Sequence, residues 1–327
     1  MHDQRISIGL IGAGIMGERL LRAILEQTPD QLRVSGVFDP SPAAMARMAA
    51  ACPDIPQMVS AAALIGASDC VYIASPPASH LGHARAAVAA GKTVFCEKPL
   101  AVDVADARAF VALAGARGAV NFPFASSPAV ATLRQWIAEG CVGQPHRISI
   151  EVAFAAWPRS WQVDAAGWLD RPAEGGFTRE VVSHFLFLAR RLYGPLQGLT
   201  ASASFPEAGH AERSIEATLR AGEVPVTLRG RVGGTTKDDH NIWLLEGDGG
   251  AVRLCDWSNA ERRRPDGVWE RAADALPQEQ ARPLALKRQL EAVVRLTCGE
   301  AHHLATLDEA LNVQEIVEAI LSSGRPG

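Results

Sequence analysis

The chain has 327 residues, of which 48% are hydrophobic and 21% charged, and its formal net charge is -4. This length exceeds what one small domain usually holds, so two domains are expected. With this weak negative charge and no long basic stretch, nothing in the sequence indicates nucleic-acid binding. The short basic run Arg262–Arg264 lies between Glu261 and Asp266 and is expected to be a solvated loop.

The cysteines and the N-terminal sequence indicate the cellular compartment in which the protein is expected. The six cysteines form no C-x-x-C pair, which favours free thiols in a reducing cytoplasm over disulfides. The nine histidines form no cluster with metal-ligand spacing, so no metal is expected. The N-terminus lacks the pattern of a secretion signal, and no apolar run is long enough to span a bilayer. We therefore expect a cytoplasmic protein with no membrane partner.

The N-terminal stretch has the pattern of a dinucleotide-binding turn. An apolar run over residues 6–11 leads into G-x-G-x-x-G and then into helical periodicity over residues 18–26. The first glycine permits a tight turn, the second lets backbone approach a pyrophosphate, and the third lets helix and strand pack closely. The residues expected to contact the cofactor here are Gly12, Gly14, Ile15, Met16 and Gly17.

A second apolar run, residues 32–38, ends at Asp39, about 20 residues after the last glycine of the turn. A carboxylate at this place accepts hydrogen bonds from the adenosine ribose and repels a 2′-phosphate. Asp39 therefore favours NAD. Pro40 and Ser41 follow it without an arginine, but Arg47 lies close enough in sequence to leave NADP open.

Short apolar runs alternate with helical ones as far as residue 122. This alternation predicts an α/β fold with a doubly wound parallel sheet, whose ligands bind at the C-terminal ends of the strands. Gly14, Asp39, Ser75 and Lys98 each follow a predicted strand, so we expect them to share one rim of the sheet.

After residue 122 the pattern changes. A helix is predicted over residues 128–139, and a hairpin turn over Glu246–Gly250. Six runs alternate in twos, which predicts an open, mostly antiparallel sheet: 146–154, 198–205, 214–219, 224–232, 241–245 and 251–254. We expect a dinucleotide-binding domain over 1–122 and an α+β substrate-binding and oligomerisation domain over 123–327. Whether the C-terminal helix packs back on the first domain stays open.

Two further stretches carry a resemblance to a known family. These are Ala74-Ser75-Pro76 followed by His80, and residues 91–101, which read GKTVFCEKPLA. Together with the glycine turn they resemble the glucose–fructose oxidoreductase/inositol dehydrogenase/MocA (Gfo/Idh/MocA) family. The resemblance implies a Rossmann domain that binds NAD or NADP and a C-terminal sheet that receives a small-molecule substrate. It also implies a homodimer or homotetramer formed through that sheet. It further implies a cis peptide before Pro99 and cofactor contacts from Ser75, Pro76, His80, Glu97 and Lys98.

The resemblance extends to a D-x-x-x-H motif after paired glycines, here Glu180 and His184 after Gly175-Gly176, with Glu in place of the usual Asp. Hydride transfer needs a proton acceptor on the substrate oxygen, and His184 is the candidate general base. Glu180 lies four residues earlier and would share a helix face with it, as an orienting group, while Lys98 would stabilise a developing alkoxide. His184 as a half-buried structural histidine, and Glu180 as an acid serving only the helix start, are the alternatives.

Trp157, Arg159 and Trp161 lie between the first strand of the second domain and the paired glycines. Aromatic rings with an arginine suit a ring-bearing or carboxylated substrate, and Arg179 is a further candidate. The tryptophans could equally cover a sheet edge. Residues 122–124 read Phe-Pro-Phe where the family often has Phe-Arg-Phe, which makes a plain sugar substrate less secure.

These residues predict an enzyme that interconverts an alcohol and a carbonyl by hydride transfer to or from NAD(P). The expected substrate is a sugar, a cyclitol or a similar polar small molecule. Two alternatives remain: an imine or cyclic-acid reductase, and a non-catalytic NAD(P)-binding regulator. Keeping both Lys98 and His184 argues against the regulator, which needs neither.

Overall fold

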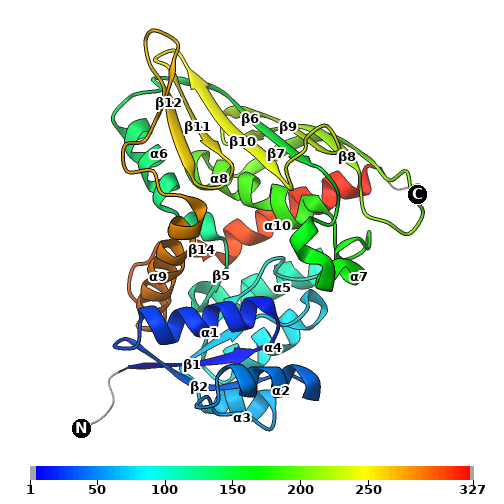
Figure 1. The fold of residues 1–327 in the computed structure, drawn as a ribbon, viewed down its shortest axis with the longest axis vertical. Helices are drawn as coiled ribbons and strands as arrows, with labels where there is room; N and C mark the ends of the chain where they lie inside the picture. Colours follow the sequence, from blue (N-terminus) through cyan, green and yellow to red (C-terminus); the bar gives the residue numbers. More distant parts are fainter. Residues whose placement is uncertain (1–4, 325–327) are drawn as a thin grey trace. The chain divides into compact units, whose positions relative to one another are not determined.

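The computed structural model describes residues 5–324, with the side chains of 163–166 left aside. It divides into two compact units. Unit 1 comprises Met1–Ser126 and Pro283–Leu311, and unit 2 comprises Ser127–Arg282 and Asn312–Gly327 (Figure 1). The expected boundary after residue 122 stays a prediction. The chain leaves unit 1 after Ser126 and returns to it at Pro283.

Unit 1 contains the doubly wound parallel sheet that the alternating pattern predicted. The strand order is β14-β5-β4-β3-β1-β2. Strands β1 to β5 pair in parallel, and only β14 runs antiparallel, against β5. Their bounds are β1 Ile6–Ile11, β2 Leu32–Phe38, β3 Cys70–Ile73, β4 Thr93–Cys96, β5 Gly118–Val120 and β14 Ala305–Thr306.

The helices of unit 1 begin at sites that the sequence encodes locally. Ser41 caps α2 by accepting a hydrogen bond from the Ala44 amide at 3.3 Å, and Asp103 caps α5 through the Asp106 amide at 2.8 Å. The helix bounds are α1 Ile15–Gln27, α2 Pro42–Ala51, α3 Ala61–Gly66, α4 Pro77–Ala89 and α5 Val104–Ala114.

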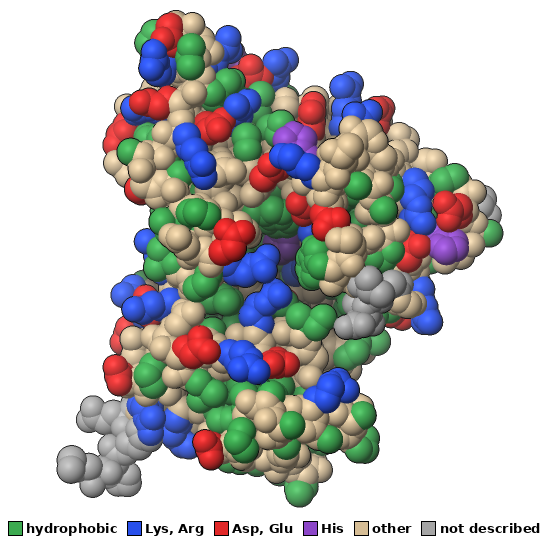
Figure 2. Space-filling view, in the orientation of Figure 1, with side chains coloured by type: hydrophobic (Ala, Val, Ile, Leu, Met, Phe, Trp, Pro, Cys, Tyr) green, Lys and Arg blue, Asp and Glu red, His purple; other side chains and the backbone are tan. Residues whose placement is uncertain are grey.

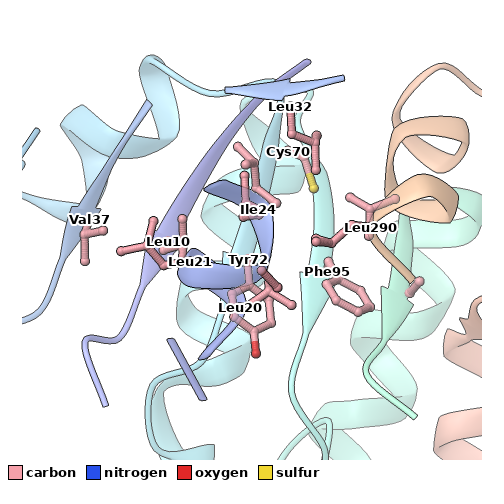
Figure 3. Close-up of a cluster of buried hydrophobic side chains, with 14 of the residues drawn as sticks. Leu10, Leu20, Leu21, Ile24, Leu32, Val37, Cys70, Tyr72, Phe95 and Leu290 are labelled. Atoms are coloured by element: carbon pink, nitrogen blue, oxygen red, sulfur yellow. The ribbon is translucent and has the colours of Figure 1, made fainter. Parts of the chain in front are cut away.

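One core of unit 1 lies between the sheet and helices from both ends of the chain. Leu20, Leu21 and Ile24 of α1 pack with Tyr72 and Phe95 of the sheet (Figure 3). Leu290 joins the same cluster from α9, Gln278–Thr297, of which residues from Pro283 onward belong to unit 1. Burying each such side chain contributes about 1.5–3 kcal/mol. Residues of α9, which come late in the chain, are therefore part of the core of unit 1.

Unit 2 is built on a second sheet, in the order β13-β12-β11-β10-β6-β9-β8-β7. All pairs are antiparallel except β6 with β9, so the predicted mostly antiparallel open sheet is confirmed. The expected hairpin turn over Glu246–Gly250 is confirmed as well, because Glu246 pairs with Ala251 across it. The bounds are β6 Pro145–Phe154, β7 Leu196–Ser204, β8 Ser214–Ala221, β9 Val224–Val232, β10 His240–Gly247, β11 Ala251–Cys255, β12 Asn259–Arg263 and β13 Trp269–Arg271.

The prediction of a solvated loop at the triple arginine was wrong. Arg262 and Arg263 belong to β12, and the Arg262 guanidinium pairs with Glu270 of β13 at 2.8 Å. The same guanidinium lies 5.4 Å from the ring centroid of Trp136. Charged cross-strand pairs stabilise this edge of the sheet, and they produce no apolar alternation for a sequence pattern to detect.

Helices and aromatic side chains cover one face of the unit 2 sheet. Phe154 of β6 packs against Phe177 and Trp157, each with 5.2 Å between ring centroids. Asn312 of α10 bonds to the Leu196 backbone of β7 through both its amide atoms, at 2.8 and 3.1 Å. The helix bounds are α6 Pro128–Ala138, α7 Ala166–Leu169, α8 Ser183–Tyr193 and α10 Leu307–Ser322.

The surface carries charges of both signs. Figure 2 shows Asp and Glu side chains interspersed with Lys and Arg side chains on the visible face.

Among the described residues, no helix combines the length and the apolar character needed to cross a membrane.

Candidate active site

The glycine turn after β1 requires glycine at two places and leaves open space at the third. A Cβ on Gly12, whose φ is 110°, would lie 2.5 Å from the Ala74 carbonyl carbon, and one on Gly17 would lie 2.0 Å from the Gly12 oxygen. A Cβ on Gly14 would meet nothing within 4 Å. Gly14 is also the N-cap of α1, and its helix start has no side-chain cap. The backbone at the start of α1 therefore fits a diphosphate, which open amide groups and the helix dipole stabilise.

Asp39 joins the end of β2 to this turn. One carboxylate oxygen accepts a hydrogen bond from the Ala13 amide at 2.9 Å, and the other accepts one from the Ser41 amide at 2.8 Å. These two bonds fix the orientation of the carboxylate. Each oxygen keeps a second lone pair, with which it could accept a bond from a ribose hydroxyl.

His80 connects the loops that follow β3 and β4. Its ring is 1% exposed, with Nε2 2.7 Å from the Ser75 carbonyl oxygen and Nδ1 2.9 Å from that of Pro99. Burial lowers the pKa of His80, and the two carbonyl acceptors oppose that change. Because both ring nitrogens face backbone acceptors, His80 would serve a cofactor by holding these loops rather than by bonding to it. Ser75 pairs its hydroxyl with that of Ser79 at 2.7 Å.

The Glu97-Lys98-Pro99 segment lies at the end of β4. The Lys98–Pro99 peptide is cis, as the family resemblance implied. Glu97 accepts hydrogen bonds from the Tyr72 hydroxyl and from Asn121 Nδ2, the latter at 2.7 Å. Burial, and then the Glu97 carboxylate, raise the pKa of Tyr72 well above its usual value. This network fixes the residue next to Lys98, and Lys98 itself is half-buried.

In unit 2 the expected α-helix through Glu180 and His184 is corrected. Residues Thr178–Val182 form a π-helical segment, and α8 begins only at Ser183. Glu180 is half-buried within the π-helical segment, whereas His184 is 8% exposed in the first turn of α8. The regular four-residue spacing on one helix face therefore does not apply. Local π-helical geometry is frequent at functional sites.

A residue that sequence reasoning missed anchors this segment. Glu212 is fully buried, and its Oε1 accepts hydrogen bonds from the Thr178 amide at 2.7 Å and the Thr178 hydroxyl at 2.6 Å. A Cβ on Gly176, whose φ is 98°, would lie 2.2 Å from Glu212 Oε2. Burial raises the pKa of Glu212. A single glutamate before a strand gives no pattern from which this contact could be predicted.

Arg179 uses its guanidinium within the protein. Nε and Nη2 pair with the Glu318 carboxylate of α10 at 2.6 and 2.7 Å, and Nη1 donates to the carbonyls of Pro172 and Gly175 at 3.0 and 2.7 Å. The side chain is 4% exposed. This arrangement suits a residue that holds the π-helical segment in place better than one that binds a substrate carboxylate.

The structure brings Trp157, Arg159 and Trp161 together. The Arg159 guanidinium lies 4.7 Å from the ring centroid of Trp161 and 5.8 Å from that of Trp157. Trp161 is 53% exposed, whereas Trp157 is buried and donates its indole N–H to the Leu169 carbonyl at 3.1 Å. Arg159 Nη1 also pairs with Asp239 at 2.8 Å, so its charge is neutralised.

His184 lies beside a second residue that the sequence did not indicate. The ring of Trp257 is 5.5 Å from that of His184 in an edge-to-face arrangement. The Trp257 indole N–H donates to Asp239 Oδ2 at 3.1 Å. The Arg159 cluster and the His184 imidazole are therefore connected through Asp239 and Trp257. Among the side chains described, no group of three His, Cys, Asp or Glu could hold a metal ion.

A parallel sheet with a glycine turn at the end of its first strand defines a dinucleotide-binding Rossmann domain, here followed by an α+β domain. Comparison with protein families agrees. Residues 6–123 match the model for the Gfo/Idh/MocA oxidoreductase family with its NAD-binding Rossmann fold, and residues 130–266 match that of the Gfo/Idh/MocA C-terminal domain. The chain therefore belongs to the Gfo/Idh/MocA family of NAD-binding oxidoreductases. No curated protein sequence matches it.

Solved structures share the fold over the whole chain. The WlbA dehydrogenase from Bordetella pertussis, in complex with NADH and UDP-GlcNAcA, is 21% identical with a TM-score of 0.81, covering 99% of this chain and 97% of that one. An oxidoreductase from Agrobacterium radiobacter with NAD+, L-tartaric acid and magnesium is 17% identical, with a TM-score of 0.80 and coverage of 98% and 96%. The UDP-N-acetylglucosamine 3-dehydrogenase GnnA from Acidithiobacillus ferrooxidans is 18% identical, with a TM-score of 0.77 and coverage of 98% of each chain.

Proposed function

We propose that this oxidoreductase interconverts an alcohol and a carbonyl on a sugar, a cyclitol or a similar polar small molecule, with NAD as the hydride carrier. Family membership supplies the reaction class. Two of the structural relatives are named as a dehydrogenase bound to UDP-GlcNAcA and as a UDP-N-acetylglucosamine 3-dehydrogenase, which supports a sugar-like substrate.

The placement of Lys98 carries this proposal. Strand β1 lies between β2 and β3, and β4 is the next strand beyond β3. Asp39 follows β2, so a dinucleotide with its diphosphate at Gly14 and its adenosine at Asp39 would extend its nicotinamide half towards the ends of β3 and β4. Lys98 follows β4. We therefore propose that its ammonium group acts on the side of the sheet rim where hydride transfer would occur.

The proton chemistry follows from the charges that develop. NAD+ held at the glycine turn and Asp39 would supply the acceptor for the hydride, with its two electrons, from the carbon of the alcohol. In the proposed reaction His184 accepts the hydroxyl proton, and Lys98 stabilises the alkoxide that forms as the proton leaves. Glu180 is proposed to keep the imidazole oriented. The product is a carbonyl compound, with NADH and one proton.

The aromatic cluster of unit 2 favours a polar neutral group over a carboxylate. Trp161, which is 53% exposed, offers a ring face, but Arg159 is already paired with Asp239 at 2.8 Å. A substrate carboxylate would meet a neutralised guanidinium there. The cyclic-acid reductase alternative therefore has less support than the sugar or cyclitol dehydrogenase.

We also propose that subunits pair through the exposed face of the unit 2 sheet. Thr227, Arg229 and Glu216 are exposed on adjacent strands β8 and β9, in alternation with buried residues. Size-exclusion chromatography with light scattering should give the mass of a dimer or tetramer. A monomer over the whole accessible concentration range would contradict this pairing.

A thermal-shift and turnover panel tests the proposed function. NAD+, NADH, NADP+ and NADPH are compared first, and a ligand at 100 times its dissociation constant should stabilise the protein by about 2.7 kcal/mol. Polyols, inositols, UDP-sugars and hydroxy acids are then supplied with the preferred cofactor while NADH absorbance is recorded. We expect NAD+ or NADH to give the largest shift, and turnover with a polyol, inositol or sugar. A protein that no nicotinamide cofactor stabilises would contradict the proposal.

A further inference from the structure

The corner between β11 and β12 has an unusual backbone. Asp256 and Trp257 have φ of 44° and 73°, and they are the non-glycine residues with positive φ in the described chain. Residues other than glycine, asparagine and aspartate rarely have a positive φ, and this backbone conformation is unfavourable for a tryptophan. Such a conformation persists only where the surrounding structure holds it, and it often accompanies a functional role.

The Asp256 carboxylate and backbone hold this corner against β10. Oδ1 accepts hydrogen bonds from the Asn241 amide and from His240 Nδ1, each at 3.0 Å, and Oδ2 pairs with Lys237 at 3.0 Å. The Asp256 amide in turn donates to the Asn241 carbonyl at 2.9 Å. These bonds hold the backbone of Asp256 in place, and Asp256 is joined directly to Trp257.

The other end of the Trp257 side chain is fixed as well. Its indole N–H donates to Asp239 Oδ2 at 3.1 Å, and the same oxygen accepts from Arg159 Nη1 at 2.8 Å. Between these two attachments the indole lies 5.5 Å from the His184 ring, at an interplanar angle of 74°, and 5.4 Å from the Phe185 ring. An edge-to-face pair of this kind has a preferred geometry, so the indole restricts how the imidazole can turn.

We propose that Trp257 is a positioning residue for the His184 imidazole, and that Asp239 holds the indole in place and connects it to Arg159. The inference rests on the proposed function, in which His184 accepts the substrate proton. The left-handed conformation of Asp256 and Trp257 is then explained, because it directs the indole at His184. A substrate group that contacts Trp161 or Arg159 would act on the imidazole through the same Asp239 carboxylate.

The imidazole can be observed directly by NMR, without a substrate. Histidine labelled with 13C at Cε1 gives one signal for each of the nine histidines, and His184→Gln identifies the signal of His184 by its loss. An indole ring shifts a nearby proton strongly, so Trp257→Leu should move the His184 signal more than that of any other histidine. Trp257→Phe, which keeps a ring and loses the N–H donor, should move it less.

Asp239→Ala removes the acceptor of the indole N–H and so tests the attachment itself. We expect it to displace or broaden the His184 signal, whereas the neighbouring Asp238→Ala should leave that signal in place. Asp238 is the matched control because its carboxylate bonds to the Ser160 hydroxyl at 2.6 Å and not to Trp257. Trp269→Phe in β13 is the control for loss of a tryptophan, since its ring lies 4.1 Å from Arg253.

An unmoved His184 signal in folded Trp257→Leu would overturn the inference. A signal that stays unmoved in both folded Trp257→Phe and folded Asp239→Ala would overturn it as well. Equal movement of all histidine signals would indicate a general loss of packing and would overturn it too. The proposed function fails separately, if His184→Gln keeps its turnover while the NMR result holds.

Discussion

The rim of the unit 1 sheet and the start of α8 in unit 2 are built in different ways. On the rim, the glycine turn, Asp39, Ser75 and Lys98 each come within two residues of a strand end, and the parallel strands bring them to the same edge. Around α8, His184, Trp257, Asp239 and Arg159 come from four separate segments of unit 2 and meet through side-chain contacts. A cofactor edge can thus follow from strand topology, whereas a substrate side depends on long-range packing.

Among substitutions in unit 2, replacing His184 should lower turnover the most. General acid–base catalysis contributes about 10²–10⁴-fold, so His184→Gln should lower kcat by that factor. The NAD thermal shift should persist, because the glycine turn and Asp39 are unchanged. Turnover close to that of the unmodified enzyme would mean that His184 is a structural histidine. Loss of the NAD shift would mean that the two regions are not independent.

Replacing Asp39 tests the rim. Asp39→Ala removes the acceptors of the Ala13 and Ser41 amides, and with them the proposed ribose contact. We expect NAD to bind about 10-fold more weakly, which corresponds to about 1.4 kcal/mol, and the preference to move towards NADP. Titrations with NAD+ and NADP+ measure both effects, with the exposed Asp54→Ala as the control. An unchanged ratio of the two affinities would place the ribose elsewhere.

The sequence predicted most of unit 1 because its signals are local. Apolar runs ending in Gly12, Asp39 and Glu97 are sufficient to locate strand ends. The pairing of Ala305–Thr306 with β5, and the packing of Leu290 against the same sheet, join residues far apart in the chain. No periodicity within either segment indicates such a contact.

The sequence predicted less of the surroundings of His184 in unit 2. It indicated His184 and Arg159, but neither the π-helical segment at Thr178–Val182 nor the contact between Trp257 and His184. Thr178, the first residue of the π-helical segment, bonds to Glu212, which lies 34 residues further along the chain. The position of Trp257 depends on a left-handed backbone that its residue type disfavours.

Glu180→Gln should have a moderate effect. In the proposed role as orienting group, the Glu180 carboxylate favours the protonated His184 imidazole, so neutralising it should move the acidic limb of the pH–rate profile to lower pH without abolishing turnover. Steady-state rates across pH measure this, with Glu174→Gln as a control outside the π-helical segment. An identical profile would assign Glu180 to the helix start alone.

His80→Asn should have the smallest effect, on stability and its pH dependence. Burial lowers the pKa of folded His80 below 6.5, so the unfolded chain binds more protons between the two values. Stability should therefore decline as pH falls through about 6.5 and level off below the folded pKa. Denaturant titrations at several pH values should show a flatter dependence in His80→Asn than in the less buried His83→Asn. If stability changed with pH equally in the unmodified protein, His80→Asn and His83→Asn, the pH dependence would not come from His80.

The most direct measurement of the central claim is the turnover of Lys98→Ala with the substrate identified by the panel, alongside its NAD thermal shift. Removing one group that stabilises a developing oxyanion costs about 10²–10³-fold in kcat. The account predicts a loss of that size with the NAD shift preserved. Turnover at the unmodified rate, with NAD still bound, would contradict it.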